Sequence, residues 1–141
     1  VISNVSGEYE DIFISASFST HASNRQAGEI RIYVIAPLTI SSGSFTWPAT
    51  ASGTIGVEGA ISFTDTEERD AACILLAKLI VDNTASAVIP FPMQAIAHLF
   101  GGRIPPGVVP FIAQNCSTTT TAGFASSGSA VHHTPIQSQY T

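Results

Sequence analysis

Apolar and polar residues alternate along two segments near the start of the chain. Over 12–19 the even-numbered positions are apolar and the odd ones are mostly serine. Over 29–36 the even positions are again apolar, whereas Glu29, Arg31 and Tyr33 share the opposite face. A period of two is typical of a strand with one buried face. We therefore predict two strands, and the polar, glycine-ended segment 20–28 between them favours an antiparallel pair.

The middle of the chain contains both strand and helix signals. Segment 41–59 is rich in Ser, Thr, Gly and Ala and is interpreted as a surface excursion with one short strand, followed by a strand over 59–64. Segment 65–83 opens with a capping residue and acids, as helices do. Its run 73–81 is apolar at both parities, however, as in a strand buried on both faces. The surrounding β pattern favours a strand over 73–82, preceded by a polar turn.

Proline and glycine punctuate the next part of the chain. The Pro90-Phe91-Pro92 stretch lacks two backbone donors, so it is not expected to continue a strand ladder. Residues Met93–Phe100 are expected to form one or two helical turns that stop at the glycine pair 101–102.

Two further strands are predicted towards the end of the chain. The segment 108–115 is predicted to be a strand, with Val109, Phe111 and Ala113 on one face, and Pro110 indicates an edge or bulge position. The segment 130–140 is interpreted as an extended closing strand.

These elements predict an all-β fold. Seven or eight short strands with Gly, Pro and Ser turns, and at most one short helix near Met93–Phe100, are typical of an antiparallel, jelly-roll-like β-sandwich. No repeat or linker is visible, so residues 1–141 are expected to form a single domain. Two neutral loops, over 41–59 and 117–129, are rich in small polar residues and are expected to be ordered against a partner.

Charged residues are scarce. They make up 11% of the chain, and lysine occurs once, at Lys78; average soluble domains contain roughly 25%. Because surface charge normally keeps small domains apart, this deficit indicates that other copies or other proteins cover much of the surface. The net charge of −5 argues against nucleic-acid binding. No apolar run reaches the ~20 residues of a membrane span, and no signal peptide is recognised.

No pattern points to catalytic, cofactor-binding or metal-binding residues. Serines are abundant, but none lies in a nucleophile elbow. His132 and His133 are adjacent, and on a strand adjacent side chains point to opposite faces, so they cannot bind one ion together. Even with His21 and His98 they give no zinc spacing, and we interpret them as surface or inter-subunit residues.

Two other groups have both a bland and a functional interpretation. An acidic cluster offers oxygen ligands for calcium but lacks the spacing of an EF-hand loop, which favours a solvated turn. Its members are Asp65, Glu67, Glu68 and Asp70. Two cysteines form no disulfide framework: Cys73 is expected to be a buried free thiol, although a bond to Cys116 is left open. This cysteine usage favours synthesis in a reducing compartment.

Aromatic residues suggest one alternative function. Trp47, Tyr33 and Tyr140 could form a sugar-stacking platform, although their spacing follows no motif. Glycosylation patterns occur at Asn4 and Asn115, but they carry no meaning without secretion.

Four segments carry a further pattern: 11–16, 28–34, 90–105 and 133–136. The third contains Pro-Phe and then Phe-Gly-Gly-Arg-Ile-Pro, and the fourth contains Thr-Pro. These segments resemble small virion structural proteins of tailed bacteriophages, in which a Pro-Phe … Phe-Gly-Gly-x-(Leu/Ile)-Pro segment precedes a strand and an Asn/Thr-rich loop, and a short Thr-Pro-type strand ends the chain. Family members carry additional residues before the first of these segments.

The resemblance implies a jelly-roll-like domain displayed on the virion, on the outer surface of the head. The expected function is that of a non-enzymatic capsid decoration (cement) protein, which binds and stabilises the shell of the major capsid protein. The class further implies synthesis in the host cytoplasm and a homo-oligomer, above all a trimer. The alternatives are a tail or fibre component that contacts another virion protein, and a carbohydrate-binding β-sandwich module that uses Trp47 or Tyr140.

Overall fold

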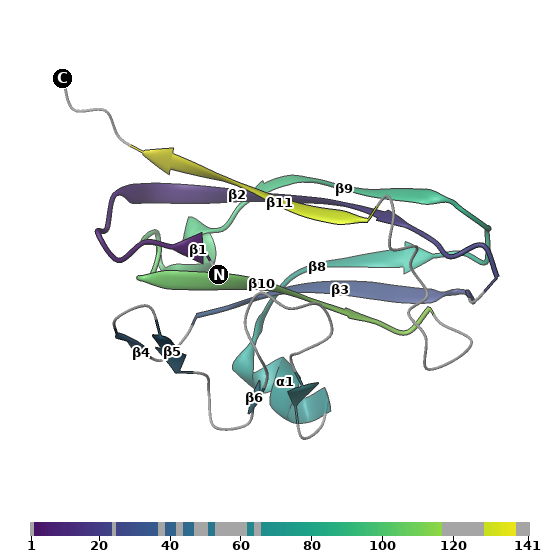
Figure 1. Cartoon of the computed structure of the whole chain (residues 1–141), viewed down its shortest axis with the longest axis horizontal. Helices are drawn as coiled ribbons and strands as arrows, with labels where there is room; N and C mark the ends of the chain where they lie inside the picture. The colour runs from purple at the N-terminus through teal and green to yellow at the C-terminus, as the bar shows by residue number, and fades with distance from the viewer. Residues whose placement is uncertain are drawn as a thin grey trace.

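Two antiparallel sheets face each other in a computed structural model of the chain (Figure 1). The structure describes residues 2–23, 25–36, 39–41, 44–46, 51–52, 62–63, 66–116 and 129–137, and for 39–63, 66 and 68 it describes the backbone alone. One sheet has the strand order β1-β10-β3-β8, and the other has the order β11-β2-β9. The all-β, sandwich-like class predicted from the sequence is therefore confirmed.

The strands of the four-stranded sheet are β1 (Ile2–Ser3), β10 (Gly107–Gln114), β3 (Gly28–Ile35) and β8 (Ile74–Val81). Those of the three-stranded sheet are β11 (Ala130–Gln137), β2 (Tyr9–Ser19) and β9 (Val88–Ala95). Two small pairs join β4 (Thr39–Ser41) to β5 (Ser44–Thr46) and β6 (Ala51–Ser52) to β7 (Ser62–Phe63). The helical elements are α1 (Thr66–Ala72) and the 3-10 turn η1 (Ala97–Phe100). Figure 1 places α1 beyond the outer face of the four-stranded sheet.

The main core lies between the two sheets. It is built from the apolar parity of β2 and of β3, as the alternation over 12–19 and 29–36 predicted. Ile12 and Ile14 of β2 face Ile30 and Ile32 of β3, and all four side chains are fully buried. Burial of this kind contributes about 1.5–3 kcal/mol for each large aliphatic side chain.

The expectation that these first two strands pair with each other is wrong. β2 pairs with β11 and β9, whereas β3 pairs with β10 and β8. The connection between them therefore crosses from one sheet to the other. Alternation alone cannot distinguish two strands that pair in one sheet from two strands that face each other across two sheets, because the apolar face of each strand is buried equally well in both arrangements.

The segment 65–83 contains both a helix and a strand. The strand predicted over 73–82 is confirmed as β8, but the polar turn expected before it is wrong, because α1 occupies those residues. The helix ends where the amide of Cys73 donates to the carbonyl of Arg69 at 3.0 Å. β8 is also an edge strand, not a strand buried on both faces: Leu75 is 48% exposed and Ile80 is 74% exposed.

The two prolines that were expected to prevent a strand lie within β9. β9 is the edge of its sheet, where a residue without an N–H can be accommodated. Pro90 stands opposite Ser17, and Pro92 falls where the register with β2 shifts. The helix expected over Met93–Phe100 is reduced to η1, which stops at Gly101 as predicted, with φ of 71° in the left-handed region that favours glycine.

The strands predicted towards the end of the chain are confirmed within the described residues, and those predicted between 41 and 64 are matched only in part. The strand predicted over 108–115 is β10, and β1 covers only its first two residues, so Pro110 lies on a free edge. The strand over 130–140 is β11, and β7 supplies part of the strand over 59–64. β4, β5 and β6 replace the single short strand expected near 41–59. The loop 117–128 lies outside the described residues.

Candidate functional site

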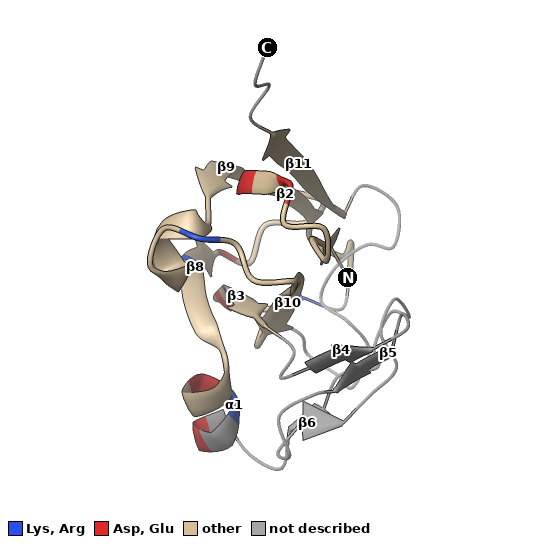
Figure 2. Cartoon of the chain, turned by 90° about the vertical axis from the view of Figure 1, so that its left-hand side faces the viewer, with Lys and Arg blue, Asp and Glu red and all other residues tan. Residues whose placement is uncertain are grey.

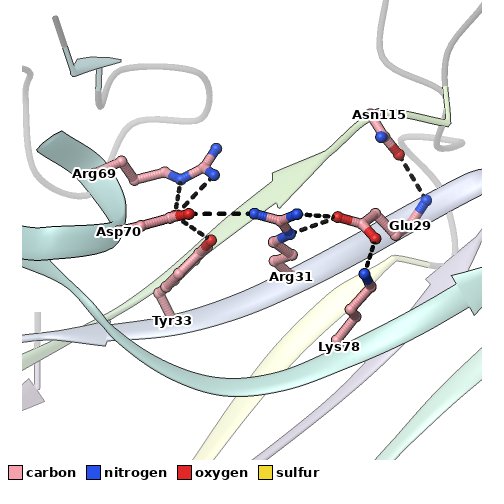
Figure 3. A network of polar contacts seen from close by, with 7 residues as sticks. All are labelled: Glu29, Arg31, Tyr33, Arg69, Asp70, Lys78 and Asn115. Atoms are coloured by element: carbon pink, nitrogen blue, oxygen red, sulfur yellow. Dashed lines mark hydrogen bonds and ion pairs between the residues drawn. The ribbon is translucent and has the colours of Figure 1, made fainter. Parts of the chain in front are cut away.

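A polar cluster occupies the outer face of the four-stranded sheet (Figure 3). It gathers three of the five lysine and arginine residues of a chain that has few charges. β3 contributes Glu29, Arg31 and Tyr33; α1 contributes Arg69 and Asp70; β8 contributes Lys78. The strand residues share one face because they pair in register, Arg31 with Lys78 and Tyr33 with Leu75.

Arg31 lies at the centre of the cluster, between two carboxylates. Its Nε and Nη2 atoms each lie 2.5 Å from Oε1 of Glu29, and its Nη1 lies 3.4 Å from Oδ2 of Asp70. The other oxygen of Glu29 binds the Lys78 ammonium. These contacts lower the pKa of the Glu29 carboxyl below its ordinary value, with the Lys78 hydrogen bond as the largest cause.

Asp70 joins the helix to the sheet. Its Oδ1 accepts a hydrogen bond from the Tyr33 hydroxyl at 2.6 Å and another from Arg69 Nε at 2.9 Å. The Arg69 guanidinium also lies over the Tyr33 ring, 5.2 Å from its centroid, in cation–π geometry. Below the cluster, Tyr33 packs with Phe111 in a small apolar group on the same face. The cluster therefore holds α1 against β3.

A pH dependence follows from Asp70. The Tyr33 hydrogen bond, followed by that from Arg69, lowers its pKa below the ordinary 3.8. A lowered pKa stabilises the fold above the unfolded value, and this contribution is lost as the pH falls through the folded value. We expect Asp70→Asn to lower the melting temperature at pH 6, and the difference from the unmodified protein to shrink below pH 3.8. Thermal melts from pH 6 to pH 2.5 test this; a difference that stays constant across the range would contradict it.

A pocket of about 150 Å³ opens beside the cluster. Glu29, Arg31 and Arg69 line it, together with the β10 end of the sheet. Each of these three charged side chains already has an ion-pair partner within the cluster. The pocket thus presents compensated charges and amide groups, an arrangement that suits a fold-stabilising network better than proton transfer. Reasoning from the sequence did not connect Tyr33 with Asp70, because nothing in the sequence shows that α1 packs over β3.

Of the other acids of the suspected calcium group, Glu67 is exposed on α1. Asp65 and the side chain of Glu68 lie outside what the structure describes. Among the described residues, no group of three or more His, Cys, Asp or Glu side chains is placed to hold a metal ion.

The histidine pair lies on β11. His132 stands opposite Ser15 of β2 and His133 opposite Ile14, which are successive positions of a strand, as predicted. Both residues contribute to the lining of a pocket of about 220 Å³, together with Ile2, Pro110 and Val131.

The two cysteines are free and buried in different places. Cys116 belongs to the main core, and Cys73 to the apolar group beneath α1. Removal from water raises the pKa of the Cys73 thiol to about 11. Because the thiolate is the reactive form, we expect both thiols to react with a disulfide reagent at pH 7 far more slowly in the folded protein than in denaturant. Rapid labelling of the native chain, read by absorbance, would contradict this.

Residues of the suspected sugar platform and glycosylation sites have other roles or lie outside the described residues. Tyr33 is 2% exposed beneath Arg69, which removes its ring face from a ligand. Trp47 and Tyr140 lie outside the residues whose side chains are described. Asn4 is buried: its Oδ1 accepts from the Tyr9 amide at 3.0 Å, and its backbone amide donates to Pro106 at 2.8 Å.

Exposed apolar residues are frequent on the two edge strands at one side of the sandwich. β8 and β9 are edge strands of the two sheets and lie on the same side (Figure 2). They carry five of the eight large apolar residues that are exposed among those described. The five are Ile74, Leu75, Ile80, Val88 and Met93. We refer to this surface, formed by the two strands, as the β8–β9 flank.

Comparisons with known proteins add no relative: no protein-family model matches the chain, and searches of curated proteins and of solved structures find no match. Within the described residues, no helix has the length and apolar character needed to cross a membrane.

Proposed function

We propose that this chain is a non-enzymatic structural subunit of a tailed-bacteriophage virion, a decoration protein that binds and stabilises the shell of the major capsid protein. The β8–β9 flank is the observation that carries the proposal. Exposed apolar residues scattered singly are ordinary, but a concentration of them along two neighbouring strand edges is typical of a surface that another protein covers. The resemblance of the four sequence segments to virion proteins indicates which kind of assembly supplies that cover.

The low charge of the chain supports the same function. A protein that is permanently assembled into a lattice does not need surface charge to prevent association with its neighbours. A cement protein works through buried contact area, and specific protein contacts bury on the order of 1,200–2,000 Å². Repetition over a lattice turns modest individual contacts into high avidity. The net charge of −5 suits the outer side of a shell, away from the packaged DNA.

The experiment compares virions with and without this protein. Particles that lack it are expected to lose their DNA at a lower temperature, and addition of the purified protein is expected to restore the original value. Dye-accessible DNA measured during a temperature ramp gives the readout. Unchanged melting, together with no binding of the purified protein to the particles, would contradict the proposal.

Copy number separates the head from the tail. Quantitative gel or mass-spectrometric analysis of purified particles is expected to give copies comparable to those of the major shell protein. A handful of copies per particle would instead favour the tail or fibre component and would overturn the decoration role.

A further inference from the structure

The four sheet edges differ in their protection against further pairing. An exposed strand edge is a template for another strand, and proteins guard such edges with short strands, prolines or charges. β1 has two residues, β9 contains Pro90 and Pro92, and β11 contains Pro135. β8 has eight residues and no proline, and within the described elements its outer edge has no strand partner. β8 is therefore the one long edge without a proline among the described strands; its single charge, Lys78, is paired with Glu29, and its register with β3 shifts between Ile32 and Tyr33.

Charge leaves this edge open to a second copy of the chain. Two copies of net charge −5 repel each other over most of their surfaces. β8 and β9 together contain a single charged residue, Lys78, and Glu29 of the neighbouring strand neutralises it. The β8–β9 flank is thus the surface on which two copies can meet without opposing like charges, provided that the register does not place Lys78 opposite Lys78.

Geometry favours a two-fold arrangement. A strand that pairs antiparallel with its own copy satisfies both edges with the same set of backbone groups, which is the isologous contact of a symmetric dimer. Because β9 lies on the same side of the sandwich as β8, the second copy would also lie beside β9 (Figure 2). Because its prolines lack an N–H donor, β9 would contribute side-chain packing against the second copy, whereas β8 would contribute the backbone hydrogen bonds.

We propose that β8 pairs antiparallel with β8 of a second copy, which joins the two four-stranded sheets into one continuous sheet across a two-fold axis. This proposal starts from the same β8–β9 flank as the proposed function and names a second copy as the protein that covers it. Its test uses the purified chain alone, so its failure is distinguishable from failure of the decoration role. It gives a dimer as the building unit, in place of the trimer that the sequence resemblance implied.

Two lysine substitutions test the proposal. Ile80→Lys places a charge on the β8 edge, where the native side chain is 74% exposed, and Val5→Lys places the same charge where the native side chain is 66% exposed, away from β8 and β9. Both sites are open to solvent, so both variants are expected to keep the native melting temperature. Leu75→Lys, at a site that is 48% exposed, is a second β8 variant in case the first does not fold.

Sedimentation velocity over a range of concentrations gives the association constant. The unmodified chain and Val5→Lys are expected to form dimers, whereas Ile80→Lys raises the dimer dissociation constant by about tenfold or more, because a charge is brought against an apolar edge. Hydrogen exchange adds a reading of the backbone: amides of 74–81 gain protection as the concentration of the unmodified chain rises, and those of Ile80→Lys do not.

The contrary outcomes are distinct. A chain that stays monomeric at millimolar concentration, a trimer that Ile80→Lys leaves intact, or equal weakening by both lysine variants would each overturn the proposal. β8 amides that become protected only on virions would show that a shell-protein segment occupies this edge. That result would overturn the dimer and leave the decoration function standing.

Discussion

Replacing Ile14 by alanine is expected to lower the free energy of unfolding by about 2–5 kcal/mol, a large share of the stability of a domain of this size. Ile14 is fully buried at the middle of β2, which is the central strand of the three-stranded sheet. The truncation removes buried apolar surface and leaves a cavity between two rigid sheets, which have little freedom to close over it. Urea denaturation followed by circular dichroism measures the effect as a lower midpoint with an unchanged slope.

Ile80→Ala is the matched control for this substitution. The same three carbon atoms are removed, but the side chain is 74% exposed. The expected loss is about 0.5 kcal/mol or less when the measurement is made at a concentration where chains do not associate. Similar losses at the two positions would contradict the placement of the core between the sheets.

Replacing Asp11 by alanine is expected to cost about 1–3 kcal/mol. Oδ1 of Asp11 accepts hydrogen bonds from the amides of Ile12, Ile96 and Ala97, at 2.7, 3.1 and 2.9 Å. It therefore fixes the start of η1 against β2. Because Ile96 and Ala97 are buried, the amide of Ala97 would be left without an acceptor and could not turn to water.

Asp11→Asn separates the acceptor from the charge. The amide oxygen can receive the same hydrogen bonds, so we expect this variant to retain most of the stability that Asp11→Ala loses. Asp82→Ala is a control in an exposed turn, where one oxygen accepts from the amide of Thr84 at 2.9 Å. Chemical denaturation of the three variants compares them directly. A loss at Asp82 as large as that at Asp11 would indicate that burial of the accepting site is unimportant.

The sequence predicted the strands whose two faces differ. β2 and β3 alternate because one face meets the main core, and a period of two records that difference directly. The predictions failed where one residue pattern fits two environments. The apolar run of β8 was interpreted as buried on both faces, although a strand made to meet another chain has the same composition. The prolines of β9 argued against a strand because a sequence does not show which strands lie at an edge.

The polar cluster was out of reach of sequence reasoning for a different reason. Asp70 and Tyr33 are far apart in the chain, and their hydrogen bond depends on α1 packing over the outer face of β3. The amino-acid sequence gives no sign of that packing beyond the acidic residues at the start of the helix. The alternation over 29–36 did place Glu29, Arg31 and Tyr33 on one face, which is the part of the cluster that a local pattern can show.

The pairing of β11 with β2 has a consequence for the order in which the fold is completed. β11 stands beside β2 in register, although more than a hundred positions separate Ala130 from Ser17. Contacts between such distant segments form late and slowly, because the entropy of closing the long intervening loop is lost before the contacts can stabilise the fold. During synthesis, one side of β2 therefore stays bare until residues 130–137 have left the ribosome. A chain truncated before that point would expose the edge of β2 that β11 covers in the complete sheet. Pairing of β11 is therefore the step that closes this sheet.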